Sequence, residues 1–283
     1  MKKYKLSKSE FSRYKKDGYI IIKNVVTPKE LFDIKNEIFL LSKNLYIKYN
    51  GYDDLKLKFE NKNFDKYLIE SKKKNLNKVT SSIYDVSKKI FTFLSIFSSE
   101  KMKKLCCDLM KTKRIGILNR GFGVRIDFPT DKFYKARLHQ DYTSQIGSTN
   151  GLVMYLPLRS VRHKHGPVIL YKSSHLNGPY DTKVKMELVK NKKTYDPFYV
   201  DLPKKKLKKF KKKELIINEG DIAFFNFCLL HESGFNHSDE IRWSMIARYM
   251  DFENKDAMEM DFIGGQHEGN IFKFKNKKPI KIQ

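Results

Sequence analysis

Apolar residues near the N-terminus recur at helical spacing, between clear start and stop signals. Ser7 and Glu10 form a capping-box pattern that begins a short helix, and Gly18 ends it. A strand, Tyr19–Lys23, follows this helix. Thr27, with proline next and an acid three residues on, begins a longer helix. This helix carries an apolar stripe that can pack against a sheet, formed by Leu31, Ile34, Ile38 and Leu41.

The pattern becomes polar and irregular from Asn50 to Asn77, with few strong periodicities, and we expect this stretch to include a loop near the site entrance. Helical spacing returns from Ser82 to Lys111. The apolar residues of this segment are far more typical of a helix packed in the protein core than of a ligand-binding stripe. We therefore expect helical N-terminal elements over about residues 1–113.

Beyond this point the pattern changes to short apolar runs between turn residues, which predicts strands. They are Gly123–Phe128, Leu152–Leu158, Val168–Tyr171, Glu214–Ile217, Asp221–Phe225 and Ile241–Tyr249. Together they predict a β-rich core over about residues 114–251. The tail, 252–283, carries one alternating segment, Ile271–Lys275, that reads as an edge strand. A chain of 283 residues suits one large domain, 1–283, with helical additions to a β core.

The run from Leu138 to Asp141 offers metal ligands. In an extended chain, residues two apart point the same way, so His139 and Asp141 can grip one ion. His231 closes a buried, aromatic strand pattern and is the best third ligand. Two histidines and one carboxylate form the facial triad of non-haem Fe(II) oxygenases. Arg242 lies in the next strand-like run, where a hairpin could return its guanidinium toward the ion to hold a carboxylate.

In their order and spacing, these residues resemble the phytanoyl-CoA dioxygenase family of Fe(II)/2-oxoglutarate-dependent oxygenases. The resemblance rests on His139-Gln140-Asp141, then on His231 with Ser233-Gly234, and then on Arg242. It extends from about Phe11 to Tyr249, and the helix–strand–helix opening is also typical of the family. The fold it implies is α+β, a double-stranded β-helix (jelly-roll, cupin-like) core with flanking N-terminal helices.

The resemblance also implies cofactors and roles. The cofactors are Fe(II), 2-oxoglutarate as co-substrate, and O2. Arg242 would fix the distal carboxylate of 2-oxoglutarate, with Ser233 and Gln140 as further contacts. Halogenating relatives lack the carboxylate ligand, so the presence of Asp141 predicts hydroxylation or a related oxidation, and not halogenation. We favour hydroxylation of an aliphatic C–H, with release of succinate and CO2.

Each proposed ligand also has a structural interpretation: a histidine in a loop, an aspartate capping a turn, a satisfied core histidine. Their joint occurrence favours a metal site. Arg125 and Tyr142 are weaker candidates for substrate contact, since Tyr142 could simply pack and Ser233 could belong to a turn. We expect His175 to be structural, and we rank the pair His163 and His165 well below the main set as ligands.

The formal net charge of +26 bears on function only if the protein binds a polyanionic partner, such as nucleic acid or an anionic membrane surface. Lysine dominates it, with nine arginines among 58 basic residues, whereas nucleic-acid readers use arginine more heavily. The run Lys204–Lys213 is typical of a solvent-exposed sheet edge or hairpin tip. The alternative is an oxygenase that acts on nucleic acid and contacts its backbone through these lysines. A non-catalytic binding protein on the same fold is another alternative. We favour a small-molecule substrate, with an anionic metabolite preferred.

Cysteine usage and the lack of long apolar runs bear on location. Three cysteines, two of them adjacent, form no disulfide framework and no zinc spacing, which favours a reducing cytoplasm. Charged residues interrupt the N-terminal segment, so a signal peptide is not expected. No run reaches the length of a membrane span.

Overall fold

The N-terminal part of the protein is helical, as the sequence predicts, in a computed structural model that describes residues 6–118, 122–131, 135–184, 198–200, 202–265 and 272–281. Both predicted capping boxes form. The Ser7 and Thr27 side chains accept hydrogen bonds from the third helical N–H, and the carboxylates of Glu10 and Glu30 at that position accept from the backbone N–H of Ser7 and Thr27. Gly18 ends the first helix at φ 84°. The helices are α1 (Lys8–Asp17), α2 (Pro28–Asn50), α3 (Lys66–Lys73), α4 (Asn77–Val86), α5 (Phe91–Phe97) and α6 (Glu100–Met110), with 3-10 turns at Asn61–Asn63 and Ser87–Lys89.

Two local details differ from the sequence pattern. The irregular stretch from Asn50 to Asn77 contains a helix that the sequence did not predict, α3, which buries Tyr67 and Leu68. Lysines cover the exposed side of this helix, so a run of three adjacent apolar residues, Tyr67 to Ile69, was its main signal. The predicted strand Glu214–Ile217 also lies earlier, at Lys212–Glu214.

Two antiparallel sheets form the core. The larger sheet has the strand order β1–β9–β4–β11–β2, with β3 paired to the other end of β11. Its strands are β1 (Tyr19–Ile22), β2 (Ile115–Ile117), β3 (Gly123–Asp127), β4 (Leu152–Pro157), β9 (Ile222–Asn226) and β11 (Arg242–Asp251). The smaller sheet, in the order β10–β5–β8, contains β5 (Val168–Tyr171), β8 (Lys212–Glu214) and β10 (His231–Ser233). Thus the predicted α+β class with an antiparallel β core is confirmed.

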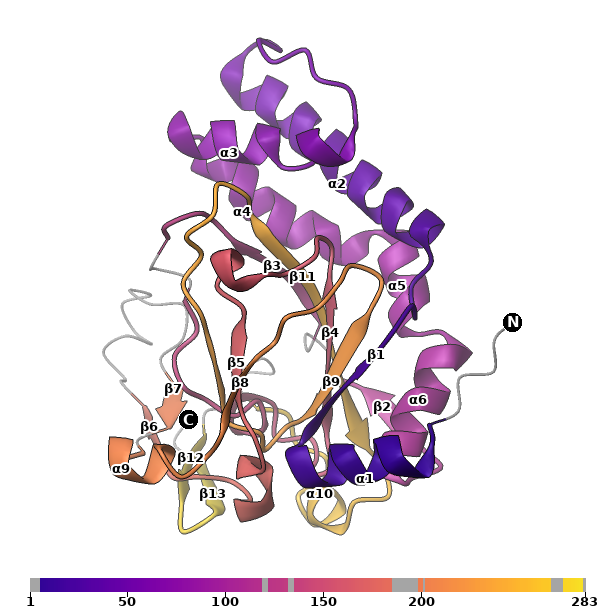
Figure 1. The fold of residues 1–283 in the computed structure, drawn as a ribbon, viewed down its shortest axis with the longest axis vertical. Coiled ribbons are helices and arrows are strands. Elements are labelled where there is room, and N and C mark those ends of the chain that lie inside the picture. The colour runs from indigo at the N-terminus through magenta and orange to yellow at the C-terminus, as the bar shows by residue number, and fades with distance from the viewer. Residues whose placement is uncertain are drawn as a thin grey trace.

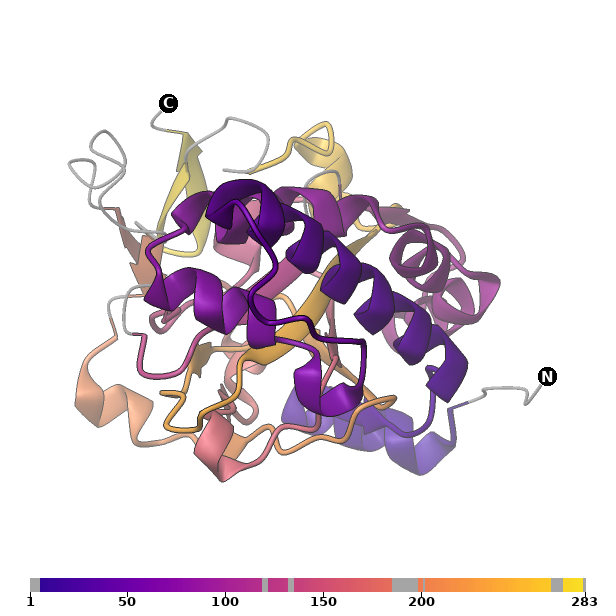
Figure 2. The ribbon, with the colours of Figure 1, turned by 90° about the horizontal axis from the view of Figure 1, so that it is seen from above.

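The helices cover the outer face of the larger sheet (Figures 1 and 2). Alternate residues of β11 point into this helical core, namely Trp243, Met245, Ala247 and Tyr249. The intervening residues therefore face the smaller sheet, and they are Arg242, Ser244, Ile246 and Arg248. A strand that is apolar on one side and bears two arginines and a serine on the other indicates a polar interior site between the sheets.

The remaining elements lie around this core. They include short helices α7 (Tyr142–Gln145), α9 (Lys204–Leu207) and α10 (Lys255–Glu259), 3-10 turns at His163–His165 and Ser174–Asn177, and the hairpins β6 (Thr182–Val184) with β7 (Phe198–Val200) and β12 (Phe272–Lys275) with β13 (Lys278–Lys281). The predicted tail strand is confirmed as β12, although Ile271 lies outside the described residues. Among the described residues, no helix is long and apolar enough to cross a membrane. The single domain, 1–283, stays a prediction.

Candidate metal centre

His139 and His231 are brought together by a pair of backbone hydrogen bonds. Each N–H donates to the other residue's carbonyl oxygen at 3.0 Å, and the ring centroids lie 4.1 Å apart. Beyond this bridge, the segment is not the strand that the sequence predicted. Asp141 has helical φ −63° and ψ −32° and begins α7, so its carboxylate converges on the histidines from the start of a helical turn.

The three predicted ligands form a compact group. One ligand atom from each of His139, Asp141 and His231 lies within 4.8 Å of the other two. Asp141 Oδ2 lies 3.2 Å from His231 Nε2. Two atoms that bind one ion at about 2.0–2.2 Å and at right angles to each other would lie about 3 Å apart. The spacing therefore fits a shared metal ion, and no other such cluster occurs in the described part of the chain.

Backbone carbonyl groups fix which nitrogen of each histidine is free. His139 Nδ1 lies 2.6 Å from the carbonyl oxygen of Arg137, and His231 Nδ1 lies 2.9 Å from that of Leu229. A carbonyl oxygen can only accept, so each Nδ1 carries the proton. Each Nε2 therefore has a lone pair available for a metal ion, which is the usual arrangement around ligating histidines.

The electrostatics of Asp141 depend on an arginine that the sequence did not single out. Arg248 Nε donates to Asp141 Oδ1 at 2.6 Å. Burial raises the pKa of this carboxyl group, but Arg248, followed by the two histidines, outweighs burial and holds the pKa well below its usual range. Asp141 Oδ2 is buried with no hydrogen-bond partner, so one oxygen is fixed by the protein and the other faces the candidate metal position.

The partly buried imidazole of His139 gives a pH-dependent stability. Burial, and next the adjacent His231, lowers the pKa of His139 to about 3, from 6.5. Between these values the unfolded chain binds a proton that the folded chain does not, so stability should fall as pH is lowered from about 6.5, by up to about 1.4 kcal/mol per pH unit. Urea unfolding of metal-free protein between pH 4.5 and 7 measures this slope. We expect a smaller slope in a His139→Asn variant, and an equal slope would contradict the assignment.

Arg242 lies on the inner face of β11, as part of the site, but no hairpin between His231 and Arg242 brings it there. His231 belongs to the smaller sheet and Arg242 to the larger, so the 234–241 segment crosses between sheets. Asp127, directly opposite on β3, accepts from Arg242 Nη2 at 3.0 Å and from Nε at 3.2 Å. The Arg242 side chain is only 2% exposed, and its Nη1 has no partner.

Two hydroxyl groups beside Arg242 are also buried without hydrogen-bond partners. They belong to Tyr155 on β4 and Ser244 on β11, and both side chains share the inner face with Arg242. Burial raises the pKa of the Tyr155 phenol, and the nearby Arg242 charge opposes this rise. Unsatisfied buried donors are costly unless a ligand completes them. A guanidinium and two hydroxyl groups together fit the carboxylate of a small anion such as 2-oxoglutarate.

The other predicted site residues have different surroundings. Ser233 is buried two residues after His231, on the same face of β10, which suits contact with a ligand at the metal. Arg125 is on the inner face of β3, where its Nη2 lies 3.0 Å from Asp127 Oδ1. Tyr142 packs its ring against Phe274, with 5.4 Å between centroids. The structure thus favours packing over substrate contact for Tyr142.

Gln140 points away from the two ligands that flank it. Its Nε2 donates to the carbonyl oxygens of Gly178 and Cys228, and its Oε1 accepts from the N–H of Tyr180 at 2.8 Å. These bonds occupy the amide group, so they support a bracing role and do not favour the predicted contact with 2-oxoglutarate.

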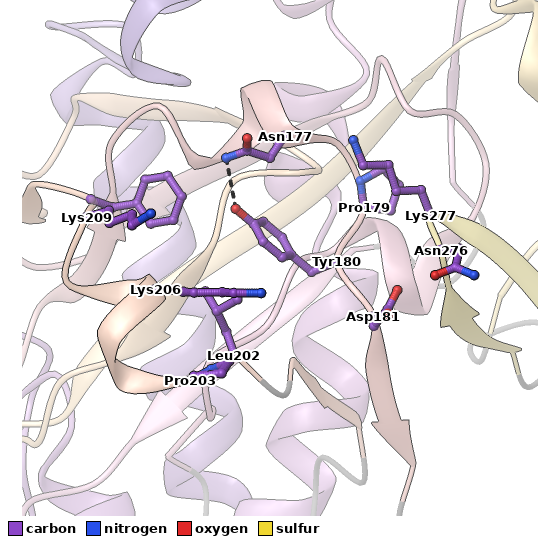
Figure 3. A pocket seen from close by; sticks show the side chains of 11 residues that line it. Asn177, Pro179, Tyr180, Asp181, Leu202, Pro203, Lys206, Lys209, Asn276 and Lys277 are labelled. Carbon is purple, nitrogen blue, oxygen red and sulfur yellow. Dashed lines mark hydrogen bonds between the residues drawn. The ribbon is translucent and has the colours of Figure 1, made fainter.

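The segment that Gln140 braces forms part of a surface pocket of about 490 Å³ (Figure 3). Tyr180 lines this pocket, and its hydroxyl oxygen accepts a hydrogen bond from Asn177 Nδ2 at 2.9 Å. Lys206 and Lys209, from the predicted lysine run, line it as well, together with Lys277 of the β12–β13 turn. The lysine run is therefore divided between this pocket, helix α9 and strand β8.

Three further histidines that the sequence offered, His163, His165 and His175, make structural contacts. His175 Nε2 donates to the carbonyl oxygen of Lys15 at 3.0 Å, in agreement with its predicted structural role. His163 contacts Glu214, and His165 lies 3.1 Å from Glu240. Neither belongs to the metal-ligand cluster of the described residues.

A two-sheet antiparallel fold with two histidines and one carboxylate converging between the sheets defines the class of Fe(II)/2-oxoglutarate-dependent oxygenases. The sequence profile of the phytanoyl-CoA dioxygenase (PhyH) family matches residues 14–244, and the chain belongs to this family. The predicted family and enzyme class are therefore confirmed. A search of curated protein sequences finds no match.

Similar solved structures confirm the jelly-roll fold. The epimerase SnoN, in complex with Fe3+, alpha ketoglutarate and nogalamycin RO, has a TM-score of 0.57 and 16% identity, over 86% of this chain and 82% of SnoN. The carbocyclase SnoK from nogalamycin biosynthesis has a TM-score of 0.55 and 13% identity, over 92% of both chains. EctD from S. alaskensis with bound Fe has a TM-score of 0.56 and 14% identity, over 88% of this chain and 78% of EctD.

Proposed function

We propose that this protein is a non-haem Fe(II)/2-oxoglutarate-dependent dioxygenase that hydroxylates an aliphatic C–H of a small metabolite and releases succinate and CO2. One observation carries the proposal. Asp141 Oδ2, without a hydrogen-bond partner, lies 3.2 Å from His231 Nε2, and the space between the sheets also holds Arg242 Nη1, which is buried without a partner. Iron, 2-oxoglutarate and O2 supply the oxidation when bound.

The residues of this chain would bind, orient and enclose these groups. His139, Asp141 and His231 would hold the iron, and their fixed orientations leave its remaining positions open. Arg242 Nη1 would hold the distal carboxylate of 2-oxoglutarate, with help from Tyr155, Ser244 and Ser233. Buried walls around these groups would exclude water from the reaction.

We also propose a class of substrate. The positive charge of the site favours a small anion. The inner face of the sheets carries Arg125, Arg242 and Arg248 against two carboxylates, those of Asp127 and Asp141. Arg125 pairs with Asp127 and not with the metal-ligating carboxylate, and its side chain is 21% exposed, whereas that of Arg242, which pairs with the same carboxylate, is 2% exposed. We assign Arg125 to the substrate side and expect a small anionic metabolite. A cytoplasmic location and the nucleic-acid alternative stay predictions.

The first test measures 2-oxoglutarate turnover by the purified protein. With Fe(II), 2-oxoglutarate, O2 and a metabolite extract, we expect succinate, together with a product that has gained one oxygen atom. Both should disappear when 2-oxoglutarate or O2 is left out. A protein that binds neither iron nor 2-oxoglutarate under anaerobic conditions would instead favour the non-catalytic alternative.

A further inference from the structure

Arg248 is hydrogen-bonded to the carboxylate of Asp141, one of the three candidate metal ligands, although the sequence pattern did not single it out. Its Nε lies 2.6 Å from Asp141 Oδ1, and the Asp141 side chain is 2% exposed. The opposite oxygen, Oδ2, faces His231 Nε2. One carboxylate thus has two different oxygens, one engaged by a cation of the protein and one directed at the candidate ion.

We propose that Arg248 is a positioning residue that restricts Asp141 to binding the iron through one oxygen, an inference that rests on the proposed function. A carboxylate can bind a metal ion through one oxygen or through both. Three protein ligands leave three positions on a six-coordinate ion, and 2-oxoglutarate needs two of them while O2 needs the third. A second bond from Asp141 would take one of these positions.

The geometry suits Arg248 to this task. It extends from the inner face of β11, opposite Val153 of β4, in a strand paired on both sides. Its guanidinium is planar and permanently charged, so it holds an oxygen in a defined direction. Arg242 cannot replace it, because six residues of strand, about 20 Å, separate the two arginines and Arg242 pairs with Asp127.

The test compares wild type with Arg248→Met, Arg248→Gln and Arg248→Lys under anaerobic conditions. When 2-oxoglutarate binds Fe(II) through its keto oxygen and its adjacent carboxylate, the complex has a charge-transfer absorption in visible light. Two open positions would still admit 2-oxoglutarate, so we expect Arg248→Met to bind Fe(II) and to show this absorption. Its affinity for nitric oxide, which binds Fe(II) in place of O2, should fall at least about tenfold, in line with the 10- to 100-fold effects of residues that orient metal ligands. Arg248→Lys, which keeps a charged donor, should recover part of this affinity.

A matched control separates this role from a general effect on folding. Arg159 has a 19% exposed side chain, much like the 18% of Arg248, and it pairs with Asp65 and Glu240 away from the metal ligands. Arg159→Met should keep both the wild-type absorption and the wild-type affinity for nitric oxide. Thermal unfolding shows whether Arg248→Met is folded. If it is not, Arg248→Gln, which keeps a hydrogen-bond donor without the charge, provides the comparison.

The outcomes are distinguishable. A folded Arg248→Met or Arg248→Gln variant whose Fe(II) complex with 2-oxoglutarate binds nitric oxide with wild-type affinity would overturn the inference. A variant that no longer binds Fe(II) would also overturn it, since Arg248 would then hold the ligand in place without controlling its coordination mode. If the wild-type protein shows no charge-transfer absorption, the proposed function fails instead.

Discussion

A His231→Ala variant is expected to lose 2-oxoglutarate turnover. The substitution removes one of three ligands and leaves Asp141 Oδ2 without the imidazole 3.2 Å away. The loss should exceed the roughly 10- to 100-fold caused by changing a partner outside the ligand set. Succinate formed per minute, at saturating Fe(II) and 2-oxoglutarate, measures the effect.

The control for this variant is His163→Ala. The His163 side chain is 81% exposed and contacts Glu214, so its loss should leave turnover unchanged. Thermal unfolding of both variants shows whether each is folded. Undiminished succinate formation by a folded His231→Ala variant would defeat the assignment of the metal centre.

The second large effect is expected at Arg242. Replacing it with methionine removes the buried cation that we assign to the distal carboxylate of 2-oxoglutarate. A hydrogen bond to a charged group contributes about 1.5–3 kcal/mol, so the affinity for 2-oxoglutarate should fall about 100-fold. Fe(II) affinity should change little, because Arg242 pairs with Asp127 and with no metal ligand. Anaerobic titration with 2-oxoglutarate measures the loss.

Removal of Arg242 also affects Asp127, whose carboxylate is buried between two arginines. Burial raises the Asp127 pKa, but Arg125 and Arg242 together lower it below its usual value. Arg242→Lys keeps a charge for Asp127 and lacks the planar fork, so it should fold and still bind 2-oxoglutarate weakly. Wild-type affinity in both variants would place the co-substrate elsewhere.

Much of the site could be predicted from sequence because its ligands are distinctive residue types beside strong local patterns. His139 and Asp141 lie two residues apart, and His231 ends a buried apolar run, so the residue types were recognisable even though Asp141 lies in a helical turn and not in a strand. The capping boxes at Ser7 and Thr27 were predictable for the same reason, since each is a purely local signal.

Other parts of the site depend on how distant strands pair. Arg248 meets Asp141 across 107 positions of sequence, and Asp127 meets Arg242 across 115. Only the register of β3, β4 and β11 brings these groups together, and no local pattern encodes it. The orientation of Gln140 was equally hidden, because its partners lie in loops around Gly178 and Cys228.

The most direct test of the central claim is a crystal structure of the protein with 2-oxoglutarate and Mn(II), a redox-stable substitute for iron. We predict one metal ion bonded, at about 2.0–2.2 Å, to His139, Asp141 and His231, with the distal carboxylate of 2-oxoglutarate on Arg242. Metal bound elsewhere, or a space between the three side chains that takes up neither metal nor 2-oxoglutarate, would contradict the account.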